Sequence, residues 1–174
     1  MSWFLLSLLT AIATASQDAW VKKWFSHLNA IEMFVYPLIF CFPLTLLCLA
    51  FIPIPELDWI FWMSFVASIP LNALPYIIYM QAIKVSPMSL TVPYLAFTPV
   101  FMIGTGYLFL GEMPDRWGMM GIAAVCIGSY VLNIDLNQKT FFEPFQAIWR
   151  EPGSWLMMIV AFLFSFSSVL GKLA

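Results

Sequence analysis

Apolar residues along the chain fall into about six long runs, and short polar or proline-containing segments separate them. The runs predict helices near residues 3–21, 31–52, 59–80, 88–110, 117–134 and 154–172. A helix of about 20 apolar residues crosses the roughly 30 Å hydrocarbon core of a bilayer. The pattern therefore predicts an all-α membrane protein with about six transmembrane helices.

Composition agrees with a lipid environment, because 63% of the residues are hydrophobic, only 9% are charged and the mean hydropathy is +0.92. The first run has no basic residues before it and ends in Asp18-Ala19-Trp20-Val21-Lys22-Lys23 rather than in a small-residue cleavage site. We therefore expect it to remain as the first helix instead of being removed as a signal peptide.

Asp18, beside Gln17, is an acidic residue within the first predicted span. Ionisable groups inside a membrane usually mark substrate or proton pathways, so both residues are candidates for substrate binding. The alternative is an aspartate at the headgroup level that pairs with Lys22 one helical turn later. The sequence leaves both interpretations open.

A polar and aromatic stripe follows one face of the third predicted helix. Ser68, Asn72, Tyr76 and Tyr79 recur at spacings of four, four and three, which place them on one side of a helix. Such a stripe suits the wall of a cavity, and Asn72, Tyr76 and Tyr79 are candidate substrate-binding residues. Hydrogen bonding between helices, a common use of these groups in membrane bundles, explains the stripe equally well.

The fourth predicted helix carries two further candidates, Tyr94 and Thr98, while Thr105 on the same helix fits a packing role. Prolines recur in the third and fourth runs and predict that these two helices are kinked and line a cavity. Small residues predict packing seams in the first helix at Ala11, Ala15 and Ala19 and in the fifth at Gly121, Ala124 and Gly128.

Several classes of function lack residues that would carry them. The chain has no His-Glu-x-x-His metal motif, no Gly-x-Ser-x-Gly elbow and no phosphate-binding loop, so the sequence predicts neither an enzyme nor a cofactor. The seven basic residues form no cluster larger than Lys22-Lys23, which gives no indication of a nucleic-acid partner. The three cysteines lie in apolar runs, and we expect neither a disulfide nor a metal site from them.

Residues 82–132 contain a set of short motifs in a fixed order. They read AIKVSP at 82–87, VP at 92–93, TP at 98–99, LGE at 110–112, WGMMGI at 117–122 and GSYVL at 128–132. In this order and spacing the chain resembles the EamA-type transporters of the drug/metabolite transporter superfamily. The resemblance covers residues 1–134 as one five-helix unit, with a loop at 135–153 and the first helix of a second unit at 154–174.

The resemblance implies half of an inverted-repeat bundle of ten helices. Ser2-Trp3 and Ser154-Trp155 open the first and the sixth predicted helices, and the five crossings between these two starting points agree with such a repeat. Members of the family export or exchange small organic solutes such as amino acids, metabolites or drugs. We therefore expect a transporter of the bacterial cytoplasmic membrane that acts as a homodimer or with a partner second half. The alternative is a non-transporting membrane scaffold or modulator.

Orientation in the membrane is predicted differently by two arguments. Five basic residues belong to the first, third and fifth loops, whereas the opposite side holds only Arg116 and Lys172. The positive-inside rule therefore places the N-terminus outside the cytoplasm. The family resemblance implies a cytoplasmic N-terminus. For this chain taken alone, the charge distribution favours the first orientation.

Overall fold

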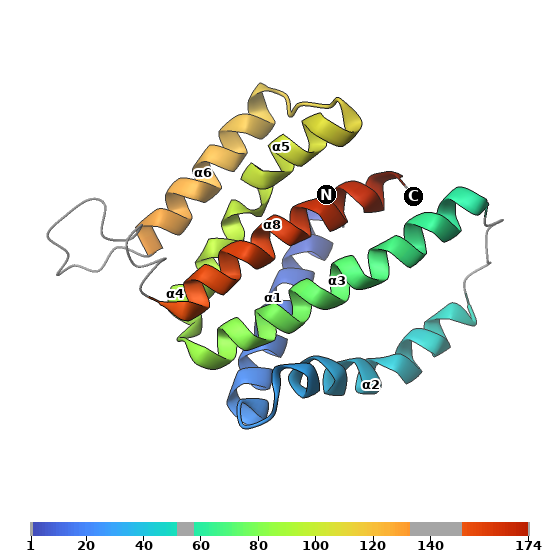
Figure 1. Ribbon diagram of the computed structural model, residues 1–174, viewed down its shortest axis with the longest axis vertical. Helices are drawn as coiled ribbons and strands as arrows, with labels where there is room; N and C mark the ends of the chain where they lie inside the picture. The colour runs from blue at the N-terminus through green and yellow to red at the C-terminus, as the bar shows by residue number, and fades with distance from the viewer. Residues whose placement is uncertain (1, 52–57, 133–150, 174) are drawn as a thin grey trace, which may run out of the picture.

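The computed structural model describes residues 2–51, 58–132 and 151–173, and the helices are labelled in Figure 1. The first three are α1 (Ser2–Phe25), α2 (Ala30–Leu49) and α3 (Trp59–Val85). The fourth segment consists of α4 (Met88–Thr91), the 3₁₀ helix η1 (Val92–Phe97) and α5 (Thr98–Leu110). The last two helices are α6 (Arg116–Leu132) and α8 (Pro152–Leu173).

The predicted class is confirmed: the chain is an all-α membrane protein. Five segments of the described residues are long and apolar enough to span a bilayer, with Met88–Leu110 counted as one segment. The shorter α6 has 17 residues and is also apolar. Most of the predicted loop at 135–153 lies outside the described residues.

Two helices end later than their hydropathy predicts. Lys22 and Lys23 form part of the last turn of α1, and Lys84 lies in the last turn of α3. Basic side chains interact favourably with the partial negative charge at a helix C-terminus, which explains why the polar residues extend these helices instead of ending them.

Helix ends agree with local capping chemistry. The carboxylate of Asp58 accepts a hydrogen bond of 2.8 Å from the backbone N–H of Phe61 at the start of α3. At the end of α5, Gly111 has φ 66° and ψ 14°, a left-handed conformation that glycine adopts without steric cost. These caps account for the start of α3 and the end of α5.

Proline affects the third and fourth segments differently. In the fourth segment the α-helix gives way to η1, which contains Pro93, and α5 resumes with Pro99 near its start. The predicted irregularity is therefore present here. By contrast, α3 continues without a break through Pro70 and Pro75.

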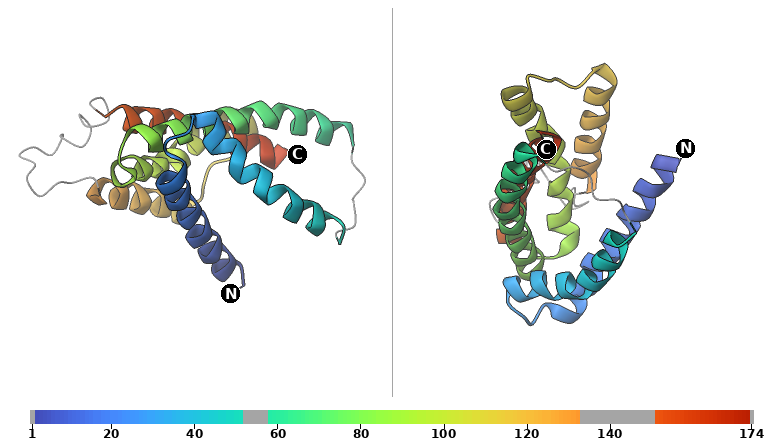
Figure 2. Two further views of the ribbon diagram at one scale, coloured as in Figure 1. Left: turned by 90° about the horizontal axis from the view of Figure 1, so that it is seen from below. Right: turned by 90° about the vertical axis from the view of Figure 1, so that its right-hand side faces the viewer.

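The core lies toward one end of the bundle. Figure 1 shows α8 between α3 and α5, and α3 and α8 form the most extensive helix pair. Most of the buried core cluster lies where the last turns of α1 and α3 meet the first turns of α2 and α8: Val21, Met33, Tyr79, Met80, Ile83, Met157 and Val160. Figure 2 shows the N-terminal end of α1 diverging from the α3–α8 layer.

The two predicted packing seams face outward in this arrangement. Ala11, Ala15 and Ala19 on α1 are exposed, as are Gly121 and Gly128 on α6. Within the described part of the chain these residues therefore do not form the close helix contacts that their small size predicts, because α1 diverges from the bundle and α6 packs chiefly against η1.

Candidate functional site in the helix bundle

Asp18 and Tyr79 form a hydrogen bond between α1 and α3. The Tyr79 hydroxyl donates to Asp18 Oδ2 at 2.5 Å, and Tyr79 is only 5% exposed. Asp18 lies seven residues before the end of α1, which corresponds to about 10 Å along the helix axis. The carboxylate is thus inside the predicted span and partly buried.

The alternative partner for Asp18, Lys22, is engaged elsewhere. Its Nζ donates a hydrogen bond of 2.6 Å to the backbone carbonyl of Ser86 at the end of α3. Within the described part of the chain a salt bridge joins Lys172 and Glu112, at the other end of the bundle. The helix-surface pair between Asp18 and Lys22 is therefore replaced by two contacts that each connect α1 to α3.

Asn72 connects α3 to α8. Its Oδ1 accepts a hydrogen bond of 2.7 Å from Ser167, and its Nδ2 donates at 2.9 Å to the carbonyl of Ser68 one turn earlier. Ser167 was not among the predicted site residues. The only signal for it was the group of serines at 165, 167 and 168 within an otherwise apolar helix.

Tyr76 has aromatic neighbours on two helices. Phe34 of α2 stacks on it with centroids 5.8 Å apart, and Phe164 of α8 meets it edge-on at 5.2 Å. Tyr76 nevertheless remains 43% exposed. The stripe on α3 thus shows features of both interpretations: Asn72 and Tyr79 bond to other helices, whereas Tyr76 has an accessible surface.

Tyr94 contacts α8 from the side opposite α3, and Thr98 follows it in the chain at the start of α5. Tyr94 is 4% exposed, stacks on Phe97 at 6.4 Å and shares a side-chain hydrogen bond with Ser154 at the start of α8. Thr98 is half-buried at the junction of η1 and α5. Tyr94 therefore belongs to the η1–α8 contact, whereas Asp18 and Tyr79 join α1 to α3.

Gln17 points away from its neighbour Asp18. It is exposed and lines an apolar groove of about 370 Å³ between α1 and α2, together with Trp20, Trp24 and Phe40. The structure therefore brings Asp18 to the bundle and leaves Gln17 on its outer surface, as expected for adjacent residues of a helix that lie about 100° apart.

Ser86 forms hydrogen bonds with three residues of other segments, a role that the sequence alone did not indicate. Its hydroxyl donates to Glu151 Oε2 at 3.1 Å and accepts from the backbone N–H of Gly153 at 3.2 Å, while its carbonyl binds Lys22. Lys84 donates nearby to the carbonyl of Leu28 at 2.6 Å. These bonds connect α1, α3 and α8 at the end of the bundle that contains the core.

Comparison with known proteins identifies a family of membrane proteins to which this chain is similar. The family model for the EamA-like transporter family matches residues 1–134. The chain belongs to this family, and its class is that of integral, multi-pass membrane transporters of small solutes. Neither the curated proteins nor the solved structures provide a match.

Proposed function

We propose that the chain moves small organic solutes, such as amino acids, metabolites or drugs, by export or exchange across the bacterial cytoplasmic membrane. The proposed pathway runs beside α1, α3 and the α4–α5 segment and includes the candidate residues Asp18, Asn72, Tyr76, Tyr79, Tyr94 and Thr98. Gln17 lies on the outer face of α1, so it contacts the solute only if the pathway also borders that face.

The Asp18–Tyr79 hydrogen bond is the observation that carries the proposal. A charged aspartate costs up to about 3 kcal/mol in membrane insertion at the centre of a spanning helix and less toward its end, whereas an interhelical hydrogen bond returns only about 1 kcal/mol. An asparagine in place of Asp18 would make the same bond to Tyr79 at lower cost. A function that needs the acid, such as binding a cation or a proton, accounts for its presence.

A partner completes this proposed pathway, either as a second copy of the chain or as a separate second half. The outward-facing small residues support it, because Ala11 and Ala15 on α1 and Gly121 and Gly128 on α6 are exposed where membrane helices pack most closely. The same seams also suit a non-transporting scaffold. Solute flux distinguishes the two functions.

The test uses purified chain in proteoliposomes and a panel of labelled amino acids, metabolites and cationic drugs. The transporter proposal predicts saturable flux of at least one class of solute, from a complex larger than one chain. Complete absence of flux from such a complex, with intact vesicles, would favour the scaffold.

The variant Asn72→Leu makes the test specific to the α3 stripe. It removes the hydrogen bonds to Ser167 and Ser68 at similar side-chain volume, and we expect flux to fall at least fivefold. Gln81→Leu on the same helix is the matched control, because Gln81 is exposed and lies outside the stripe. If Asn72→Leu and Gln81→Leu both transport normally, Asn72 is a packing residue.

A further inference from the structure

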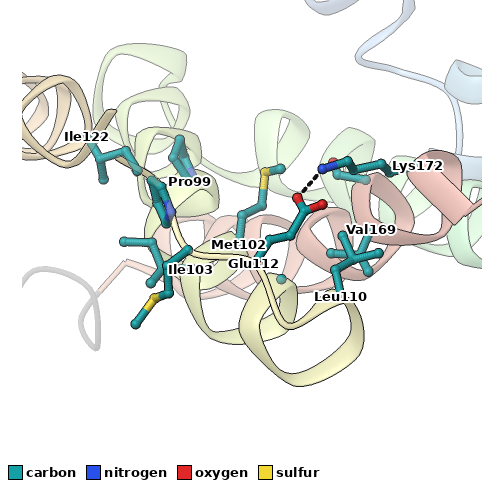
Figure 3. Close-up of a pocket in the computed structure, with 12 residues that line it drawn as sticks. Pro99, Met102, Ile103, Leu110, Glu112, Ile122, Val169 and Lys172 are labelled. Carbon is teal, nitrogen blue, oxygen red and sulfur yellow. Dashed lines mark hydrogen bonds and ion pairs between the residues drawn. The ribbon is translucent and has the colours of Figure 1, made fainter. Parts of the chain in front are cut away.

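A groove lies between α5, α6 and α8, separate from the Asp18–Tyr79 pair (Figure 3). Its volume is about 270 Å³. One face of α5 forms its long wall, with residues at spacings of three and four: Pro99, Met102, Ile103, Gly106 and Leu110. The eleven residue steps from Pro99 to Leu110 correspond to about 16 Å along the helix, roughly half the thickness of a bilayer's hydrocarbon core.

Charge is confined to one end of this groove. Lys172 of α8 and Glu112, which follows α5, form an ion pair there, and their side chains are 57% and 58% exposed. Figure 3 shows the two side chains directed toward each other. From this end the walls continue with apolar residues as far as Pro99 and Ile122. The groove therefore has one basic and one acidic group at one end, followed by an apolar channel about as long as one leaflet of the bilayer.

We propose that this groove binds a membrane phospholipid with a phosphoethanolamine headgroup. One acyl chain lies along α5, the lipid phosphate pairs with the Lys172 ammonium, and the lipid ammonium pairs with the Glu112 carboxylate. Each charge of the protein's ion pair then receives an opposite charge from the lipid, and the apolar walls receive hydrocarbon.

Charge complementarity selects this occupant over two others. An anionic phospholipid satisfies Lys172 but places its negative charge beside Glu112, which is unfavourable. A soluble zwitterion satisfies both charges but leaves the apolar wall of α5 without a partner over most of its length. Only a lipid that carries both charges matches the headgroup end and the chain end together.

Native mass spectrometry of the full chain, released from detergent micelles that contain defined lipid, tests the proposal. We expect dioleoyl phosphatidylethanolamine to be retained at least threefold better than dioleoyl phosphatidylglycerol. Glu112→Gln should remove that preference, and Lys172→Gln should weaken retention of both lipids about two- to fivefold, the range that a half-exposed ion pair supports. Asp115→Asn, at the same end of the bundle but outside the groove lining, should change neither lipid.

Two glycines of α5 test the chain-binding part of the groove. A Cβ at Gly106 would have one neighbour within 4 Å, the Glu112 carbonyl oxygen at 3.8 Å, so the backbone at this position accepts a side chain. Gly106→Leu should therefore fill the groove and lower the retention of phosphatidylethanolamine to that of phosphatidylglycerol. Gly104→Leu adds the same side chain where no atom lies within 4 Å of the Cβ and should leave retention unchanged.

Three outcomes would overturn the proposal. The first is equal retention of the two lipids by the unmodified chain. The second is an unchanged preference in both Glu112→Gln and Gly106→Leu, which would show lipid bound elsewhere on the surface. The third is displacement of the lipid by equimolar glycerophosphoethanolamine, the soluble headgroup, which would identify a site for a soluble zwitterion.

Discussion

Replacing Asp18 with asparagine is expected to lower solute flux in proteoliposomes at least tenfold while leaving expression and membrane insertion intact. The asparagine keeps the size of the side chain and an oxygen that accepts a hydrogen bond from Tyr79, so the contact between α1 and α3 is preserved. Only the negative charge is lost. Insertion should improve slightly, because a neutral amide is less costly in the bilayer than a carboxylate.

The matched control removes an exposed negative charge immediately before α6. Asp115 accepts a hydrogen bond of 2.8 Å from the backbone N–H of Gly118 at the start of α6, and asparagine caps a helix about as well as aspartate. Asp115→Asn should therefore keep normal flux. Tyr79→Phe, which removes the hydroxyl and leaves the Asp18 charge, should reduce flux less than Asp18→Asn. Normal flux in Asp18→Asn would assign Asp18 to helix packing.

Gly153→Ala is expected to destabilise the protein by about 2 kcal/mol, through overpacking. A Cβ at this position would lie 2.5 Å from Ser86 Cβ and 2.6 Å from Thr91 Cγ2, so α8 must move away from α3 and α4. That movement also weakens the hydrogen bond from the Gly153 N–H to Ser86. For a chain of this size the expected fall in Tm is about 4–8 °C.

Thermal unfolding in detergent, followed by near-ultraviolet circular dichroism, measures this change. Gly171→Ala in the same helix is the control, since a Cβ there has no neighbour within 4 Å. Alanine is the better helix former, so this variant should be unchanged or slightly more stable. A Gly153→Ala protein that melts with the unmodified chain would show that α8 does not approach α3 as closely as the structure indicates.

Much of the fold could be predicted because the bilayer makes hydropathy a strong signal. A spanning segment must satisfy its backbone polar groups internally, so a long apolar run has almost no alternative to a helix. The interruption of the α-helix at η1 could also be predicted, from Pro93 and Pro99. The ends of α1 and α3 were misplaced because Lys22 and Lys84 bind backbone carbonyls of neighbouring segments, and hydropathy takes no account of these contacts.

The arrangement of the candidate site was less accessible from the sequence. Spacing placed Asn72, Tyr76 and Tyr79 on one face of α3, but it could not show that they contact different helices. Ser86 and Ser167 were missed for the same reason, since their roles depend on which residues the packing of α8 brings beside them. The groove of Glu112 and Lys172 joins residues 60 positions apart, and no local motif connects them.

The partner proposal and the site proposal depend on different surfaces. Exposed seams on α1 and α6 support the partner, whereas the polar contacts of α3 support the pathway. A complex that assembles but does not transport would support the partner proposal and contradict the pathway proposal. Orientation in the membrane stays a prediction of the charge distribution.

The central claim is that the polar face of α3 borders a water-filled pathway instead of serving only for packing. Rates of labelling by a water-soluble methanethiosulfonate reagent, applied to both sides of the membrane, test it without knowledge of the solute. Tyr76→Cys and Leu74→Cys are compared in a chain whose Cys41, Cys48 and Cys126 are replaced by alanine.

Tyr76 and Leu74 lie at nearly the same depth on opposite faces of α3, and they are 43% and 54% exposed. Thiolates form and react in water, not in hydrocarbon, so lipid exposure alone gives no labelling. We expect the cysteine at position 76 to react at least tenfold faster than the cysteine at position 74. Equal rates at the two positions would contradict the pathway and leave the stripe as a packing surface.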